Sequence, residues 1–294
     1  MQCYFVGFEE RKIISCRIEF YKSFHSYINS KNKLKITTIC AIHDDINSYL
    51  KWINFLDTFA LDKNISFQHL LISSKDKLAN ENSSIKFFSV DEKSFWARSI
   101  KYGLDKIHKE CDTDYILIFN HDSIPSLEGV KEALELIEIN DLVSGTISNK
   151  ASNENIFGLN KEISFLKFKV LNDNESTDKA VCAHGNFLLF SYETYREIKF
   201  LPNFSHTFLD FYISSWFIKN KKKVSRTFNP VGFTDESLQF RREKLKSDTG
   251  IFKPGRSNIK DVYTFYKFYK NFVTAFTLVI YHFFKELFFR LKNL

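Results

Sequence analysis

The sequence predicts an α/β protein with one open, twisted sheet covered by helices, followed by an amphipathic helical tail. Two observations lead to this prediction. Short runs of apolar and β-branched residues alternate with segments of helical periodicity through the first half of the chain. The 294 residues are 44% hydrophobic and 26% charged, an ordinary globular composition with enough chain for one large α/β domain and an appendage.

The first half of the chain has the order of strands and helices expected for a sheet covered on its faces. Residues 35–42 are apolar and β-branched, which is typical of a buried strand. Residues 114–119 are almost wholly apolar, so we expect this strand near the centre of the sheet. The other expected strands are 66–73, 85–90 and 141–148, and the expected helices are 46–60, 94–108 and 127–139.

The second half of the chain is less regular. Residues 149–180 are polar, and we expect them to form a connecting excursion over the surface. A strand at 182–190, helices at 193–199 and 208–219, and a strand at 224–228 are expected to follow. The chain therefore divides into a lead-in at 1–33, an α/β domain at 34–233, a loop-like connector at 234–261 and a tail at 262–294.

Charge and cysteine content narrow the class of protein. A net charge of +7 favours anionic partners, such as a nucleotide diphosphate or an anionic membrane surface, and is too weak and dispersed to indicate nucleic acid. The five cysteines form no CxxC pair, so we expect neither a disulfide framework nor a zinc site, and a reducing cytosol fits best. No GxGxxG, Walker, HExxH or GxSxG motif occurs.

Ligands of open α/β sheets bind outside the carboxyl ends of the strands, so these ends are the place to look for a site. Asn120, His121, Asp122 and Ser123 follow the apolar strand 114–119. Asp122 at this rim could hold Mg²⁺ or Mn²⁺ against a diphosphate. The alternative is that Asp122 is a turn or cap residue before the next helix.

Residues 34–230 resemble glycosyltransferase family 2, and within it the rhamnosyltransferase-like branch. The segment DYILIFNHDSIPS resembles the family's Asp-x-Asp motif and keeps Asp122, Ser123 and Pro125, with Asn120 in place of the first Asp. The resemblance implies a GT-A fold, a nucleotide-diphosphate-sugar donor and a divalent cation, Mn²⁺ or Mg²⁺. It also implies that Asp122 is the main ligand of the metal and diphosphate, and that Asn120 is a neutral ligand or a ribose contact.

The same resemblance implies where the donor binds. Residues from the ends of the first two strands would lie near the base and ribose, although the family usually has an Asp directly after the second strand, where this chain has two Ser. A solvated turn with a helix cap is the alternative for the first of these ends, and a surface salt bridge is the alternative for Arg98. The implied donor-binding residues are Ala41, His43, Asp45, Ser73, Asp76, Arg98, Asn120, His121 and Asp122.

The acceptor side lies in the second half of the chain. The resemblance places His184, Gly185 and Asn186 under the sugar, with a core-packing turn as the alternative. It makes Asp210, in Phe208-Leu209-Asp210, the catalytic base of an inverting transfer, because the acceptor hydroxyl must lose a proton as it attacks the sugar. The alternative for Asp210 is a helix N-cap.

The tail at 262–294 is aromatic and basic, and its apolar run at 272–284 is too short to span a bilayer. An amphipathic helix of this kind suits the membrane interface, and packing on the domain or in a dimer is the alternative. The expected partner surface is the cytoplasmic membrane, which would place the chain in the cytoplasm, peripheral to the inner face.

The function expected from these features is inverting sugar transfer to a glycan or lipid-linked acceptor, in synthesis of bacterial surface polysaccharide or lipopolysaccharide. Two alternatives remain open. One is a sugar-nucleotide-binding protein without turnover, which the replacement at Asn120 favours. The other is a nucleotidyltransferase, which would need a glycine-rich basic loop after the first strand, where this chain has Asp44 and Asp45.

Overall fold

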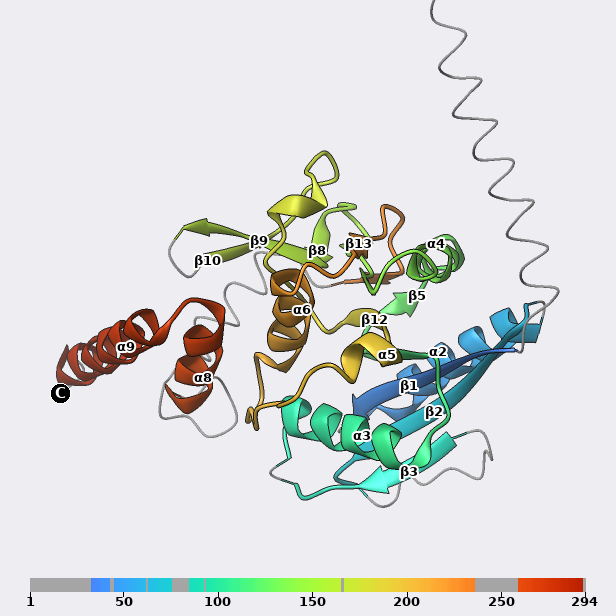
Figure 1. Cartoon of the computed structure of the whole chain (residues 1–294), viewed down its shortest axis with the longest axis horizontal. Helices are drawn as coiled ribbons and strands as arrows, with labels where there is room; N and C mark the ends of the chain where they lie inside the picture. Colours follow the sequence, from blue (N-terminus) through green and yellow to red (C-terminus); the bar gives the residue numbers. More distant parts are fainter. Residues whose placement is uncertain are drawn as a thin grey trace, which may run out of the picture.

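The computed structural model describes residues 33–42, 45–61, 63–75, 85–92, 94–164, 167–235 and 259–292. The expected α/β architecture is confirmed: a mixed sheet lies at the centre and helices cover it (Figure 1). His43 and Asp76, two of the expected donor-binding residues, lie outside the described residues, as do the lead-in before residue 33 and most of the connector.

Within the described residues the central sheet has seven strands. The strands β1, β2, β3 and β4 are parallel, whereas β12 runs antiparallel to both of its neighbours, β4 and β6. The apolar strand β4 has three strands on each side, which confirms its expected central position. In spatial order the strands are β13 (Val224–Arg226), β6 (Leu142–Ser144), β12 (Phe187–Ser191), β4 (Tyr115–Phe119), β1 (Leu34–Ile42), β2 (Ile65–Ser73) and β3 (Ile85–Ser89).

Two apolar cores flank the sheet, because alternate residues of a strand point to opposite faces. Ile39 of β1 belongs to the core under α3 (Trp96–Glu110) and α6 (Leu209–Lys219). Cys40 belongs to the core under α2 (Ile46–Leu61) and α4 (Leu127–Ile137). A short helix, α5 (Tyr192–Tyr195), follows β12.

The polar segment 149–180 was expected to be a surface excursion, and this expectation is wrong. It contains strands of two small sheets, with the strand orders β10-β9-β11 and β5-β14-β7-β8. The expected strand at 141–148 is also two strands in different sheets, separated at Gly145, where a Cβ would lie 2.6 Å from the Phe187 ring. The elements of the small sheets and the adjoining 3₁₀ turn are β5 (Ile124–Pro125), β7 (Ile147–Asn149), β8 (Asn155–Phe157), β9 (Leu159–Ser164), β10 (Lys167–Val170), η2 (Thr177–Lys179), β11 (Cys182–Ala183) and β14 (Gly232–Thr234).

The tail consists of two helices, α8 (Ile259–Tyr269) and α9 (Phe272–Lys292), rather than the single amphipathic helix expected. The first helix, α8, packs against α6 through aromatic side chains. Phe265 stacks on Phe208 with ring centroids 4.9 Å apart, and Phe268 lies 4.3 Å from Tyr212. None of the helices in the described part of the chain combines the length and the hydropathy needed to cross a membrane.

Candidate functional site

The carboxyl ends of β1, β2 and β4 meet at one edge of the sheet, because these strands are parallel. The antiparallel β12 begins at this edge, with Phe187 opposite Phe119 of β4. The segments that follow β4 and precede β12 therefore lie side by side, and the backbone N–H of Asn120 donates to the carbonyl of Asn186 at 3.0 Å. Because β12 runs antiparallel to β4, two segments that are far apart in the sequence lie at the same rim.

Trp96, the first residue of α3, connects these two segments. Its indole Nε1–H donates to the side-chain oxygen Oδ1 of Asn120 at 2.8 Å. Its ring covers Gly185, where a Cβ would lie 2.5 Å from the ring and 3.0 Å from the Cβ of Asp210. Only a residue without a side chain fits at Gly185, because the tryptophan ring and the aspartate lie against its backbone.

Asp210 lies in the first turn of α6, and its half-buried carboxylate accepts two backbone hydrogen bonds. Gly185 N–H donates to Oδ2 at 2.7 Å, and Phe211 N–H donates to Oδ1 at 2.9 Å. The helix N-cap is Phe208, with a left-handed φ of 72°, so Asp210 is not the cap residue. These two hydrogen bonds orient both oxygens of the carboxylate.

Asp122 is exposed at the turn after β4, near the end of β1. Burial raises the pKa of the Cys40 thiol, and the negative charge of Asp122 raises it further, so the carboxylate lies within electrostatic reach of β1. Trp52 of α2 fixes the turn by donating to the carbonyl of Ser123 at 2.7 Å. The following helix, α4, has Ser126 as its N-cap, so Asp122 does not cap it.

Asp45 and His121 lie near the same end of β1. Hydrogen bonds from Ser48 lower the pKa of Asp45, and the charge of His121 lowers it slightly more. The Ser48 N–H donates to the Asp45 carboxylate at 3.0 Å, which is the geometry of an N-cap on α2. The helix-cap alternative therefore applies to Asp45, whether or not this residue also touches a donor.

His184 is held by the small sheet next to the rim. Its Nδ1 lies 3.0 Å from the amide Nδ2 of Asn160, which is a donor, so Nδ1 is the acceptor. Its ring lies between Phe157 and Phe211, with centroid distances of 5.4 Å and 5.3 Å. A neutral His184 thus carries its proton on Nε2.

The structure also describes three other residues that were expected to bind the donor. Ala41 is buried, and Ser73 is buried with its hydroxyl accepting from the N–H of Lys75 at 3.1 Å. Arg98 is exposed on α3, and its charge acts on Asp261 of α8, where it opposes the rise in pKa that burial causes.

Within the described residues, no three His, Cys, Asp or Glu side chains are placed to hold a metal ion by themselves. The sequence predicts a different arrangement, in which one exposed carboxylate would share a cation with a diphosphate and water. Asp122 is the exposed carboxylate for which the sequence predicts that role. The side-chain oxygen of Asn120 accepts from Trp96, so a cation at this oxygen would share it with the indole N–H.

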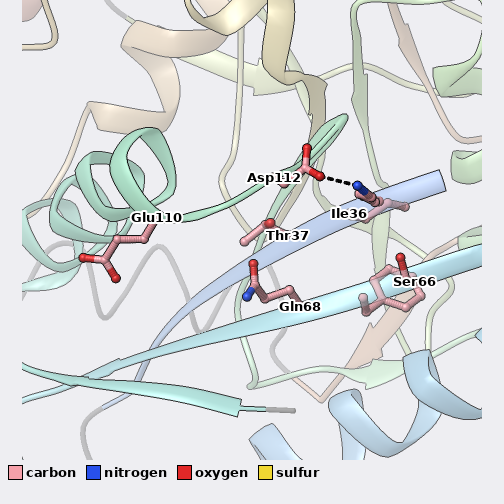
Figure 2. A pocket seen from close by; sticks show the side chains of 8 residues that line it. Ile36, Thr37, Ser66, Gln68, Glu110 and Asp112 are labelled. Atoms are coloured by element: carbon pink, nitrogen blue, oxygen red, sulfur yellow. Dashed lines mark hydrogen bonds and ion pairs between the residues drawn. The ribbon is translucent and has the colours of Figure 1, made fainter. Parts of the chain in front are cut away.

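A hollow of about 370 Å³ lies elsewhere on the molecule, at the amino ends of β1 and β2 (Figure 2). Lys35, Thr37, Ser66 and Gln68 line it from the sheet, and Asp112 pairs with Lys35 at its border. The amino ends of parallel strands are opposite to the rim that holds Asp122 and Asp210. None of the expected site residues lines this hollow, so it is separate from the candidate site.

No protein-family model matches the chain, and no curated protein matches it. Among solved structures, the chain is similar to the crystal structure of S. aureus TarS 1-349, at 11% sequence identity and a TM-score of 0.43. The matched region covers 80% of this chain and 70% of that chain. Such a distant likeness assigns neither a family nor a reaction to this chain.

Proposed function

We propose that this chain is an inverting glycosyltransferase, which moves a sugar from a nucleotide-diphosphate sugar to a hydroxyl of a glycan or lipid-linked acceptor. The observation that carries the proposal is the junction of Asn120, Trp96, Gly185 and Asp210 at the carboxyl rim of the sheet. This junction joins the segment that carries Asp122 to the helix that carries Asp210. Two carboxylates at one rim suit a reaction with a leaving diphosphate and a proton to remove.

Asp210 is the proposed catalytic base. The acceptor oxygen forms a bond to the anomeric carbon, the bond from that carbon to the diphosphate oxygen breaks, and the diphosphate leaves with the electron pair. The hydroxyl proton passes to Asp210. Hydrogen bonds from Gly185 and Phe211 fix the carboxylate in one orientation, which favours a proton transfer that depends on geometry.

Asp122 is the proposed ligand of a divalent cation, Mn²⁺ or Mg²⁺, next to the diphosphate. A bound cation would supply positive charge against the leaving group. Asn120 has a different role, because its oxygen accepts from Trp96 and its amide Nδ2–H₂ remains a donor group. We assign Asn120 to a hydrogen bond with an acceptor oxygen of the donor substrate, either a ribose hydroxyl or a diphosphate oxygen.

The biological setting we propose is assembly of a bacterial surface polysaccharide or lipopolysaccharide at the inner face of the cytoplasmic membrane. It is supported by the resemblance of residues 34–230 to family 2 enzymes and by the excess of basic over acidic residues, 42 against 35. A hexose such as rhamnose is the candidate sugar.

A donor-binding assay tests the proposed role of Asp122. Thermal shifts with a panel of nucleotide sugars should rise with Mn²⁺ present, and Asp122→Ala should abolish this metal-dependent rise. Asp105→Ala is a matched control, because Asp105 is an exposed carboxylate of α3 paired with Lys101, away from the rim. Equal shifts in the wild type and in Asp122→Ala would contradict the assignment.

A turnover assay tests the proposed role of Asp210 as the catalytic base. Asp210→Asn keeps an oxygen that can accept from Gly185 but removes the basic carboxylate, so it should bind donor normally and lose about 100-fold or more in turnover. Near wild-type turnover would show that another group takes the proton.

The two alternative functions predict other results. A sugar-nucleotide-binding protein without turnover would bind donor and transfer nothing with any acceptor. A nucleotidyltransferase would release pyrophosphate from a nucleoside triphosphate and a sugar phosphate, whereas sugar transfer releases a nucleoside diphosphate.

A further inference from the structure

The second tail helix, α9, exposes large apolar side chains along the side that faces away from the domain. Val273 and Phe288 are each 70% exposed. We call the following set the outer face of α9: Val273, Phe276, Ile280, Tyr281, Phe284 and Phe288. Single exposed apolar residues are common on protein surfaces, but a continuous set of this size marks an interaction surface.

The outer face lies opposite to the contacts that hold α9 to the domain. Ala275 and Leu278 of α9 are fully buried and belong to the core shared with α3 and α6. With 3.6 residues per turn, these two side chains point away from an outer face that covers about 140° of the helix circumference. In Figure 1, α9 extends from α8 away from the central sheet.

We infer that the outer face of α9 binds the surface of an anionic lipid bilayer, with the helix lying in the plane of the interface. A flat apolar phase covers a face of this width, whereas pairing with a second helix uses a narrower stripe. The side chains are mainly Phe and Tyr, which suit the boundary between headgroups and acyl chains.

Charge supports an anionic surface. No charged residue occurs from Phe272 to Phe284, whereas the sequence from 259 to 292 has six Lys or Arg against two Asp or Glu. Lys267 and Lys270 are exposed just before α9, and Lys270 also pairs with Glu162. Basic side chains beside an apolar helix face attract acidic headgroups, and each contributes to membrane affinity near the surface.

Binding of the full chain to vesicles tests the inference. Wild-type protein should sediment with vesicles of phosphatidylcholine containing about a third phosphatidylglycerol, more weakly with phosphatidylcholine alone, and more weakly at high salt. The measurement needs no sugar donor, so its result is independent of the transfer reaction. Failure of the folded wild type to bind anionic vesicles would overturn the inference.

A triple variant, Phe276→Ser, Ile280→Ser and Phe284→Ser, should lower vesicle partitioning by about 100-fold or more, because it removes three large apolar side chains from the contact. The matched control replaces three exposed apolar residues elsewhere, Leu61→Ser, Ile139→Ser and Phe200→Ser, and should bind like the wild type. Equal loss in both triple variants would overturn the inference. If the wild type elutes as a dimer, the outer-face variant as a monomer, and neither binds vesicles, the occupant is a second copy of the chain.

A conservative variant covers the case in which the triple variant does not fold. Phe276→Trp keeps an aromatic side chain on the outer face and adds a fluorophore to the three native tryptophans. Phospholipids brominated on the acyl chains should quench this added fluorescence more than that of the wild type. Absence of extra quenching in vesicle-bound protein would mean that another surface contacts the lipid.

Discussion

At the scale of single residues, the hydrogen bond from Trp96 fixes the orientation of the Asn120 side-chain amide. Because an indole N–H can only donate, the atom of Asn120 that faces it must be the oxygen. An aspartate at this position would still accept from Trp96 and would add a negative charge next to Asp122. The amide is therefore compatible with the fold of the rim and differs from a carboxylate mainly in charge.

We expect Asn120→Asp to bind Mn²⁺ about tenfold more tightly than the wild type in the presence of a nucleoside diphosphate, because a second carboxylate joins Asp122 at the cation. Electron paramagnetic resonance of free Mn²⁺ measures the affinity. Asn54→Asp, on the exposed side of α2, adds the same charge away from the rim and should leave the affinity unchanged. Equal affinities in wild type and Asn120→Asp would place the cation away from this pair.

At the scale of elements, the start of α2 shows how one carboxylate can have a structural role inside a candidate site. Asp45 caps the helix through Ser48, and these hydrogen bonds favour its charged form. Its folded-state pKa is lowered, so its contribution to stability is present above the ordinary value of 3.8 and is lost as the pH falls through the folded value.

We expect Asp45→Ala to lower the free energy of unfolding by about 1 kcal/mol at neutral pH, the usual effect of losing a helix cap. Asp45→Asn should keep most of the stability, because asparagine also caps helices, but should lose the acid-dependent part. Urea unfolding at neutral and acidic pH measures both. If Asp45→Asn retains stability but weakens donor binding, the residue also contacts the donor, and unchanged binding would restrict it to the cap.

The elements that could be predicted from the sequence are those with strong local patterns. The apolar segment of β4 and the amphipathic α3 lie where periodicity placed them, within two residues at each end. The segment 149–180 could not be predicted, because its strands are short and its order depends on distant groups. Buried Arg226 donates to the carbonyls of Leu171, Asn172, Asp173 and Glu175, contacts that no local pattern indicates.

In the candidate site, too, the sequence indicated some of the residues and missed others. The order of β4 and β12 in the sheet brings Asn120 next to Asn186, and the hydrogen bond from Gly185 brings Asp210 of α6 to the same rim. Trp96 was missed, although a half-buried tryptophan in the first turn of a helix at the rim of the sheet needs a partner for its indole N–H. Whether the expected residues bind donor and acceptor stays a prediction.

At the scale of the whole molecule, the first tail helix belongs to the core of the α/β domain. Phe265 of α8 is fully buried and lies next to Phe208, Phe211 and Tyr269. Because Phe208 and Phe211 flank Asp210, the packing of α8 supports the backbone of the proposed base.

We expect Phe265→Ala to lower the free energy of unfolding by about 3–5 kcal/mol, because it leaves a cavity in this aromatic cluster. Far- and near-ultraviolet circular dichroism should follow a single transition in the wild type, since α8 shares the core of the sheet. Phe284→Ala, on the outer face of α9, should change stability by less than about 0.5 kcal/mol. A separate early transition that both proteins share would mean that the tail unfolds independently.

The reversed strand β12 has a consequence for synthesis of the chain on the ribosome. The β1–β4 unit is complete once Phe119 has emerged, but one edge of β4 has no partner until residues 187–191 follow. During that interval YILIF is an unpaired, apolar strand edge, which is the kind of surface that joins to other nascent chains. Overproduction of the protein should therefore be sensitive to the rate of translation and to chaperones that cover such edges.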